Sequence, residues 1–276
     1  TCVRINMADT IVFDLETKKE FAEIGNRENL HLLGVSVLCA YSYDEDKFYS
    51  FEEKDLSSFE KMLFAAGRVI GFNIKGFDIP VLRPYLNLSP VPVPLLDLMD
   101  DVVAGVGFRV SLDNLCQTTL GASKSAHGLD AVKWYREGKM EEIKKYCTDD
   151  VRLTRDLYEF GKQNGHVLFL SRDEAGRIAI PVHWSFESSP NIRQVLSDAL
   201  QKKFSVEIDY VTRSSDSSAP ARNLRLIDIY KLDGDFFEGY CHLRKGPRIF
   251  KIDRVLAAKL TALPYKVPAE AQTKLL

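Results

Sequence analysis

The chain has 276 residues, of which 45% are hydrophobic and 28% charged, which excludes a disordered or fibrous protein. Its formal net charge of −2 excludes a strong overall attraction to polyanions. The charge is uneven, however, because the part from Ser188 onward has 15 Lys and Arg against 10 Asp and Glu, and the part before it has 22 against 29. An acidic front and a basic back predict two functional units.

The first part of the chain alternates strand and helix patterns. Short apolar runs rich in β-forming residues predict strands at 11–15, 32–43, 47–51, 68–72 and 93–100. Helical spacing and capping signals predict helices at 56–67, 78–86, 111–116, 128–138 and 139–165, followed by a hairpin of 166–171 and 177–184. This order predicts an α/β domain over residues 1–184.

A second unit follows a polar, Pro-marked linker at 185–190 and covers residues 191–276. Helical spacing predicts one amphipathic helix at 192–203. Short strands are predicted at 204–211, 222–232, 236–243, 248–255 and 257–263, with Ser, Asp and Gly in the loops between them. Such regularly spaced short strands predict a small β-barrel.

Cysteine usage and hydropathy bear on where the protein works. The five cysteines form no CxxC pair, which argues against a zinc site, and their odd number fits the reducing cytoplasm. No apolar stretch is long enough to span a bilayer, and no secretion signal precedes the first strand. We therefore expect a cytoplasmic protein that does not engage a membrane; the sequence does not reveal its oligomeric state.

Two carboxylates stand at the end of the first apolar strand. Because residues i and i+2 of a strand share a face, Asp14 and Glu16 project together. Like charges this close repel, and burial makes their ionisation costly. Protonation, solvent at the strand end, or a divalent metal with oxygen ligands would each relieve the repulsion. Taken alone, the pair favours solvation.

Three further acidic positions extend this pattern. Asp78 opens a predicted helix directly after a strand and loop, where it would also serve as a helix cap. Tyr146 and Asp150 lie one helical turn apart and therefore reach the same side, as an ordinary exposed pair would. Asp97, at another strand, is predicted to support the structure rather than to act directly.

These segments, in order, resemble the three exonuclease motifs of the DEDD superfamily, in its tyrosine-bearing branch. The motifs are Asp14-Leu-Glu16-Thr17, Asn73 to Asp78, and Tyr146-Cys-Thr-Asp-Asp150. The surrounding text HLLGVSV, GFNIKGFDIPVL, SLDNLC and YCTDDVRLT is similar to ribonuclease H-like exonucleases predicted in bacteria and their phages. The resemblance covers about residues 8 to 184 and implies a ribonuclease H-like mixed sheet flanked by helices.

The resemblance implies a metal-dependent 3′→5′ exonuclease that acts on single-stranded DNA or RNA. Two Mg²⁺ or Mn²⁺ ions would activate water and stabilise charge on the phosphate. The implied metal ligands are Asp14, Glu16, Asp78 and Asp150.

The same resemblance assigns the residues around the metals. Tyr146 would orient the attacking water, and the family spacing selects Asp150 rather than its neighbour Asp149. Asn73 matches the substrate-facing Asn of the family, and Thr17 would touch the terminal nucleotide. Phe72 would stack on a base, unless it packs in the core.

From about Asn191 the sequence resembles a WYL domain, a small Sm-like β-barrel frequent in bacterial regulators and phage-defence proteins. The naming triplet is degenerate, since Phe236-Phe237-Glu238 stands in its place, and Leu226 replaces a usual Pro. Such domains bind nucleic acid or a nucleotide-like ligand through basic and aromatic residues. The candidates here are Tyr210, Arg222, His242, Arg244, Arg248 and Arg254. The alternative is that the aromatic residues pack in the core and that Arg254 pairs with Asp253.

Three functions are compatible with this sequence. The first is an exonuclease with a WYL module that regulates it or feeds it substrate. The second is a catalytically weak nuclease fold that serves as a regulator while the WYL unit senses a ligand. The third is a structure-specific endonuclease on the same fold. The intact acidic motifs argue against the second, and the tyrosine of the third motif favours the first by resemblance.

Overall fold

A computed structural model describes residues 9–87, 91–123, 128–171, 176–184, 192–212 and 221–267. The chain divides into two compact units, one made of 1–104 with 108–158 and the other of 105–107 with 159–276. The predicted linker at 185–190 lies outside the described residues. The predicted domain limits stay predictions.

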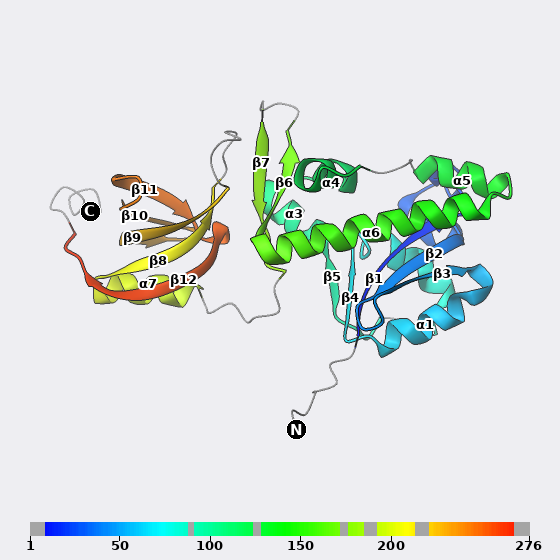
Figure 1. Ribbon diagram of the computed structural model, residues 1–276, viewed down its shortest axis with the longest axis horizontal. Coiled ribbons are helices and arrows are strands. Elements are labelled where there is room, and N and C mark those ends of the chain that lie inside the picture. The colour runs from blue at the N-terminus through cyan, green and yellow to red at the C-terminus, as the bar shows by residue number, and fades with distance from the viewer. Residues whose placement is uncertain are drawn as a thin grey trace, which may run out of the picture. The chain divides into compact units, whose positions relative to one another are not determined.

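The first unit is built on a five-stranded sheet of order β3-β2-β1-β4-β5 (Figure 1). The strands are β1 (Thr10–Thr17), β2 (Val35–Ser42), β3 (Lys47–Glu52), β4 (Arg68–Gly71) and β5 (Leu95–Asp97). β1, β2 and β3 are antiparallel neighbours, whereas β4 runs parallel to β1 and β5 parallel to β4. The predicted mixed sheet is therefore confirmed.

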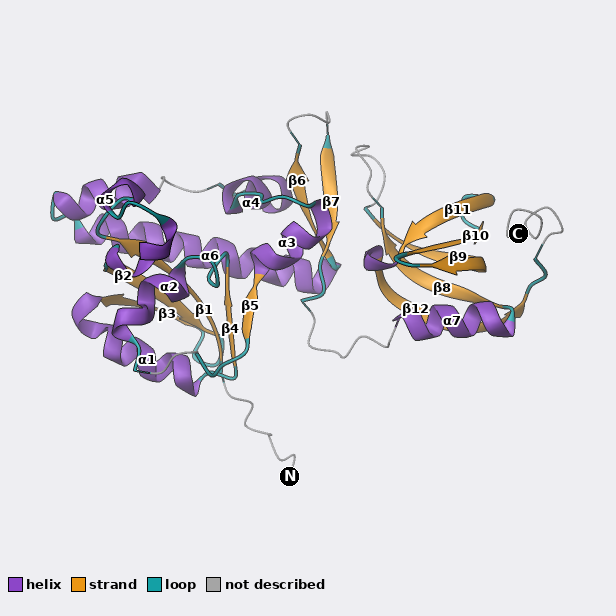
Figure 2. Ribbon diagram, turned by 180° about the vertical axis from the view of Figure 1, so that it is seen from behind, coloured by secondary structure: helices purple, strands orange, loops and turns teal. Residues whose placement is uncertain are grey.

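Helices flank this sheet on both faces, with α1 on one and α6 on the other (Figure 2). The helices of this part of the chain are α1 (Leu56–Ala65), α2 (Asp78–Leu82), α3 (Leu98–Val106), α4 (Leu112–Leu120), α5 (Gly128–Arg136) and α6 (Met140–Asn164), with the short 3-10 helices η1 (Phe21–Glu23), η2 (Arg27–Leu32), η3 (Glu53–Asp55) and η4 (Arg83–Tyr85). No helix in the described part of the chain is both long and apolar enough to cross a membrane.

The alternation of side chains along β1 explains this layering. Ile11, Phe13 and Leu15 are buried in one hydrophobic cluster with residues of α1 and α2. Asp14 and Glu16 belong to the opposite set of β1, and the long helix α6 contacts the strand there through Cys147, whose thiol donates to the Asp14 carbonyl (3.4 Å). One face of β1 thus supplies the core and the other supplies carboxylates.

The structure corrects three predicted elements. Of the helix expected over 78–86, α2 covers only Asp78–Leu82 before η4, and the strand expected over 248–255 ends at Lys251, before a 3-10 helix at 252–254. The strand expected over 93–100 ends at Asp97, and helix α3 begins at Leu98. The reason is local, because the Asp97 carboxylate accepts a hydrogen bond from the Met99 backbone amide (3.1 Å) and so caps the first turn of α3. The 3-10 helices were also absent from the predicted elements.

The second unit contains the end of α6, a hairpin and a five-stranded antiparallel sheet. The hairpin is β6 (His166–Leu170) with β7 (Arg177–Pro181), and the sheet has the order β11-β10-β9-β8-β12. Its elements are α7 (Ile192–Lys202), β8 (Phe204–Val211), β9 (Arg222–Asp233), β10 (Phe236–Cys241), β11 (Gly246–Lys251), η5 (Ile252–Arg254) and β12 (Val255–Pro264). This antiparallel sheet is compatible with the predicted small β-barrel, and the pairings of the described strands do not join β11 to β12.

Glycine 71 ends β4 where the backbone turns tightly against β1. β1 and β4 pair only over Thr10–Val12 and Arg68–Ile70, after which the two strands part. A Cβ atom on Gly71 would overlap Ile74 Cγ2 and lie 3.1 Å from the Phe13 carbonyl oxygen. Because Ile74 is completely buried, it has little room to move away. Glycine is therefore required here for close approach rather than for a positive φ.

We expect Gly71→Ala to lower the free energy of unfolding by about 2 kcal/mol, because the added methyl group overpacks the junction. Urea unfolding followed by circular dichroism measures the change. Gly128→Ala is the matched control, since a Cβ there meets no atom within 4 Å. An equal effect of the two substitutions would contradict the steric account.

Candidate active site

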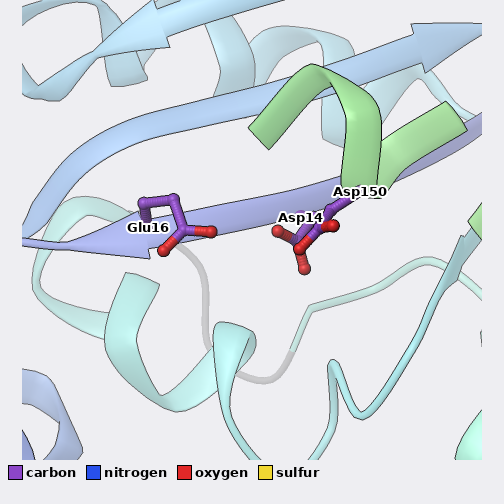
Figure 3. Close-up of side chains that lie close together, drawn as sticks. All are labelled: Asp14, Glu16 and Asp150. Carbon is purple, nitrogen blue, oxygen red and sulfur yellow. The ribbon is translucent and has the colours of Figure 1, made fainter. Parts of the chain in front are cut away.

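Three carboxylates from two elements meet beside β1 (Figure 3). Asp14 and Glu16 come from β1 and Asp150 from α6, and one oxygen of each lies within 4.8 Å of the others. Glu16 is 8% exposed and Asp150 is 2% exposed. Carboxylates this close and this buried repel strongly unless a cation lies among them. Oxygen donors of this kind are the ligands that Mg²⁺ and Mn²⁺ prefer, so the chemistry of the donor set fits such an ion.

Asp78, the fourth predicted ligand, lines the same cavity in the structure as these three carboxylates. It is 2% exposed, and its Oδ1 accepts a hydrogen bond from the Leu15 backbone amide (3.1 Å). Leu15 lies between the two acids of β1, at the level where β4 no longer pairs with the strand. Asp78 is the first residue of α2, whose cap position is Phe77, so the alternative role as helix cap is not the one observed.

Tyr146 lies one turn before Asp150 on α6, as its spacing predicted, and is 3% exposed. Its ring meets Trp134 edge-on with the ring centroids 6.2 Å apart. Burial raises the pKa of its phenol far above the ordinary value, and the charges of Asp150, Glu16 and Asp14 add to that rise. In the metal-free protein, the hydroxyl therefore keeps its proton at neutral pH and acts as a hydrogen-bond donor.

Two adjoining cavities of about 440 and 420 Å³ open beside these residues. Both are lined by Asp14, Phe72, Asn73, Gly128 and Tyr146. The first also has an apolar wall, formed by Phe21, Leu33, Phe77, Leu129 and Val132. The second is completed by Met99, Ser111, Leu112 and Asp113. We call the two together the cleft.

The three predicted substrate residues differ in how they face the cleft. Phe72 and Asn73 line both cavities, whereas Thr17 is buried and its hydroxyl donates to the Lys19 carbonyl (2.9 Å). Thr17 lines the first cavity, but the hydrogen bond occupies its hydroxyl proton within the chain.

Two exposed apolar side chains are among the residues of the cleft that the sequence did not predict. Phe21 is 49% exposed and Leu129 is 68% exposed, and both line the first cavity. Phe21 belongs to an unpredicted 3-10 helix, and Leu129 lies in the first turn of α5, so neither position carried a signal. Arg136, at the end of α5, forms ion pairs with Glu20 and Glu23 of the η1 region.

Two family models match this chain, one in each part of the sequence. A model of the RNase H superfamily matches residues 11–160. The chain belongs to the RNase H superfamily. A model of the WYL domain matches residues 191–260, in the second unit of this RNase H superfamily protein. No curated protein matches the chain.

Two solved structures are similar to parts of this RNase H superfamily chain. RNase D of Trypanosoma brucei has 18% sequence identity and a TM-score of 0.43, over 55% of this chain and 57% of that one. Proteasome accessory factor B/C of Arthrobacter aurescens has 13% identity and a TM-score of 0.23, over 83% of this chain and 24% of that one. The chain thus spans less than two thirds of the length of either protein.

Among the candidates of the WYL domain, the structure buries Tyr210 and Arg254, each 8% exposed. The Tyr210 hydroxyl accepts a hydrogen bond from the Lys251 amide (3.2 Å), and Asp253 pairs with Lys251 rather than with Arg254. Arg254 Nη1 has no hydrogen-bond partner in the described part of the chain. The alternative pairing of Arg254 with Asp253 is therefore not formed.

The other WYL candidates lie nearer the surface. The guanidinium of Arg222 binds the Asp209 carboxylate and the Gln163 carbonyl oxygen (3.2 Å), so it holds the fold together. His242 Nε2 lies 3.0 Å from Asp228 Oδ2. Arg244 and Arg248 are exposed.

Arg225 of β9 was missed, although it is 7% exposed and its guanidinium lies over the Tyr210 ring, 5.0 Å from the centroid. Burial lowers its pKa. Its Nη2 donates to Thr212 Oγ1 (2.6 Å), and its Nε has no hydrogen-bond partner among the described residues. Its place in the sequence carried no signal of burial, so a buried arginine was not expected there.

We expect Mn²⁺ or Mg²⁺ to raise the thermal unfolding midpoint of the first unit, because a cation relieves the repulsion among Asp14, Glu16 and Asp150. At an ion concentration 100-fold above the Kd, the gain in unfolding free energy is about 2.7 kcal/mol. Differential scanning calorimetry with the metal and with chelator measures it. Asp150→Asn should remove the metal effect, and Asp149→Asn, whose carboxylate pairs with Arg152, should retain it. A metal effect that survives Asp150→Asn would contradict the assignment.

Proposed function

We propose that this protein is a metal-dependent 3′→5′ exonuclease that releases nucleotides from single-stranded DNA or RNA, and that its WYL domain binds nucleic acid or a nucleotide-like ligand. The observation that carries the proposal is the buried cluster of Asp14, Glu16 and Asp150 beside Tyr146. Membership of the RNase H superfamily supports a nuclease. The order of the acidic motifs along the chain, together with Tyr146, supports an exonuclease rather than another nuclease of this superfamily.

The donor set assigns the chemistry of the site. Two Mg²⁺ or Mn²⁺ ions held by Asp14, Glu16, Asp78 and Asp150 would supply a hydroxide nucleophile and stabilise charge on the phosphate and the leaving 3′ oxygen. The hydroxyl of Tyr146, one helical turn from Asp150, would donate a hydrogen bond and orient the attacking water. Asp78 also fixes the β1 backbone between the two acids through the Leu15 amide.

The apolar wall of the first cavity supports a single-stranded substrate. Phe21, Phe72 and Leu129 present apolar surface beside the carboxylates. A cavity of about 440 Å³ accommodates one unpaired base against such surface, and stacking on aromatic rings is tolerant of sequence. A base-paired end would have to open before its terminal base could enter.

The basic second unit supports the binding role of the WYL domain. The exposed Arg244 and Arg248 supply positive charge for phosphates. The buried Arg225 and Arg254 have guanidinium nitrogens without hydrogen-bond partners in the described part of the chain, beside Tyr210. Buried donors of this kind favour an anionic ligand.

We expect Asp14→Ala and Asp150→Ala each to reduce Mn²⁺-dependent release of mononucleotides on the order of 10³-fold, because either change disrupts the metal site. The assay uses 5′-labelled and internally labelled oligomers of DNA and RNA, single- and double-stranded, with Mg²⁺, Mn²⁺ or chelator. Asp149→Ala is the control and should stay active. Early internal fragments would favour the endonuclease, and wild-type activity in Asp14→Ala would exclude the proposed site.

Tyr146→Phe separates the role of the hydroxyl from that of the ring. Removal of the hydroxyl should lower kcat roughly 100-fold, because the attacking water loses its orienting donor. The metal-induced rise in the unfolding midpoint should remain, since the carboxylates are untouched. If the variant loses both properties together, Tyr146 supports the metal site rather than the water.

Arg244 and Arg248 changed together to Ala should weaken binding of single strands by the full-length protein and flatten its salt dependence by about 0.7 for each phosphate that is no longer neutralised. Fluorescence anisotropy against salt concentration measures both. Arg222→Ala should lower stability instead, because the Asp209 carboxylate loses its partner. Unchanged affinity and salt dependence in the double variant would show that neither arginine contributes to binding.

A further inference from the structure

Two cysteine thiols lie beside Asp14, where β2 meets α6. Cys39 of β2 stands opposite Asp14 in the antiparallel register of β1 and β2, so the two side chains share a face of the sheet. Cys147 of α6 follows Tyr146, and its thiol donates a hydrogen bond to the Asp14 carbonyl (3.4 Å). Both cysteines are completely buried. The function proposed above uses neither of them.

The two thiols contact each other. Cys39 and Cys147 are free thiols and are hydrogen-bond neighbours through their sulfur atoms. Helix α6 also holds Cys39 in place, because the Cys39 thiol donates to the Lys144 carbonyl (3.7 Å) and accepts from the Thr148 hydroxyl (3.4 Å), one helical turn further along. A disulfide requires two sulfurs that already approach each other closely, and this pair meets that requirement.

A bridge between these sulfurs would disturb the acidic cluster. A disulfide holds its sulfurs about 2.05 Å apart, much closer than two thiols in contact. β2 and α6 would therefore have to approach each other at this point, and a close-packed interior transmits such a shift to its neighbours. Those neighbours are implied metal ligands, since Asp14 lies beside Cys39 and Asp150 lies three residues after Cys147 on the same helix.

The bridge would also remove a hydrogen bond from Asp14. The Cys147 thiol loses its proton when its sulfur joins Cys39, so the Asp14 carbonyl loses a donor. Mg²⁺ demands near-ideal octahedral geometry with oxygen ligands at about 2.0–2.1 Å. A small displacement of Asp14 relative to Asp150 therefore lowers the affinity for the ion.

We propose that Cys39 and Cys147 form a redox switch, in which a peroxide oxidises them to a reversible disulfide and the bridge weakens divalent-metal binding at Asp14, Glu16 and Asp150. The effect on the metal deepens the proposed function and rests on it, whereas formation of the bridge does not.

The oxidation balances with a peroxide as the only co-reactant. One thiol attacks an oxygen of hydrogen peroxide and the O–O bond breaks, which gives a sulfenic acid and one water. The second thiol attacks the sulfur of the sulfenic acid, the S–O bond breaks, and a second water leaves as the disulfide forms. The two thiols together lose two electrons and two protons, and a dithiol reductant restores both by exchange.

Burial makes the reaction depend on a local opening of α6 over β2. Neither sulfur is exposed, so peroxide reaches the pair only when this contact opens. A metal ion held by Asp14 of β1 and Asp150 of α6 would tie the same parts of the fold together. The coupling is reciprocal, because an ion that binds the dithiol form more tightly also makes the bridge easier to reduce, by the same factor.

Peptide mapping tests the bridge itself. The full-length protein is treated with hydrogen peroxide in chelator, blocked with N-ethylmaleimide and digested with trypsin, which releases Cys39 within residues 28–47 and Cys147 within residues 146–152. Mass spectrometry should find these two peptides joined with the loss of two hydrogens, and dithiothreitol should separate them. Cys39→Ser should abolish the linked product, and Cys116→Ser, which alters another completely buried cysteine, should keep it. Sulfinic or sulfonic acids instead of the link, links to other cysteines, or an unreacted pair would overturn the proposal.

Calorimetric titration with Mn²⁺ tests the effect on the acidic cluster. After removal of the peroxide, the oxidised full-length protein should bind Mn²⁺ about tenfold more weakly than the reduced protein, within the usual range of coupling between two sites. Cys39→Ser given the same peroxide treatment should keep the affinity of the reduced wild type, because no bridge can form. Should Cys39→Ser fail to fold, Cys39→Ala carries the same comparison. Equal affinities of the oxidised and reduced wild type would overturn the switch.

A redox titration checks the reciprocal effect. Saturating Mn²⁺ should raise the midpoint potential of the Cys39–Cys147 couple by about 30 mV, which is the same tenfold factor for a two-electron reaction. An unchanged midpoint would contradict the coupling. If the linked peptide forms but the reduced wild type binds no Mn²⁺, the metal site of the proposed function fails and the switch fails with it. If the reduced protein binds Mn²⁺ and releases nucleotides but no linked peptide forms, only the switch fails.

Discussion

The site of the first unit depends on one hydrogen bond, which the Leu15 backbone amide donates to the Asp78 side chain rather than to a neighbouring strand. β1 pairs with β4 only as far as Val12, and beyond that point the Leu15 amide donates to Asp78. The parting of the strands opens the space beside Asp14 and Glu16, and the carboxylate of Asp78 satisfies the amide that would otherwise be buried without a partner. Gly71 permits the close approach of backbone on the other side of the gap. One local break in the ladder thus makes room for the cluster.

Much of this arrangement follows from periodicity that the sequence displays. The two-residue period of a strand placed Asp14 and Glu16 on one face, and the helical turn placed Tyr146 and Asp150 on one side. The helix and strand limits around them were close to those observed. What spacing alone could not establish was that α6 contacts β1 at the Asp14 carbonyl, since that contact joins residues 133 positions apart. The resemblance to known exonuclease motifs supplied that connection.

The rest of the site could not be predicted because its contacts are not periodic. Arg109 reaches Asn73 from 36 residues away, and Asp97 reaches the same turn through backbone amides that are identical in every residue. Phe21 lines the cleft from an irregular segment. In the second unit, Arg222 carried the basic signal expected of a binding residue yet pairs with Asp209, while the unexpected Arg225 is buried over Tyr210. The residue type shows that each side chain is charged, but only the tertiary contacts show whether that charge is paired, buried or exposed.

The Asp97 carboxylate accepts hydrogen bonds from the backbone amides of Asn73 and Lys75 and so clamps the turn after β4. This clamp has a consequence for the thermodynamics of binding. A loop that orders only when its ligand arrives loses conformational entropy at that moment, about 1–2 kcal/mol for each residue fixed. Asp97 holds the amides of Asn73 and Lys75 through hydrogen bonds within the chain, so that loss is incurred during folding instead. Contacts made by the turn can then appear in the affinity almost undiminished. A short, rigid turn can therefore contribute as much to holding a strand as a longer, more basic but flexible loop.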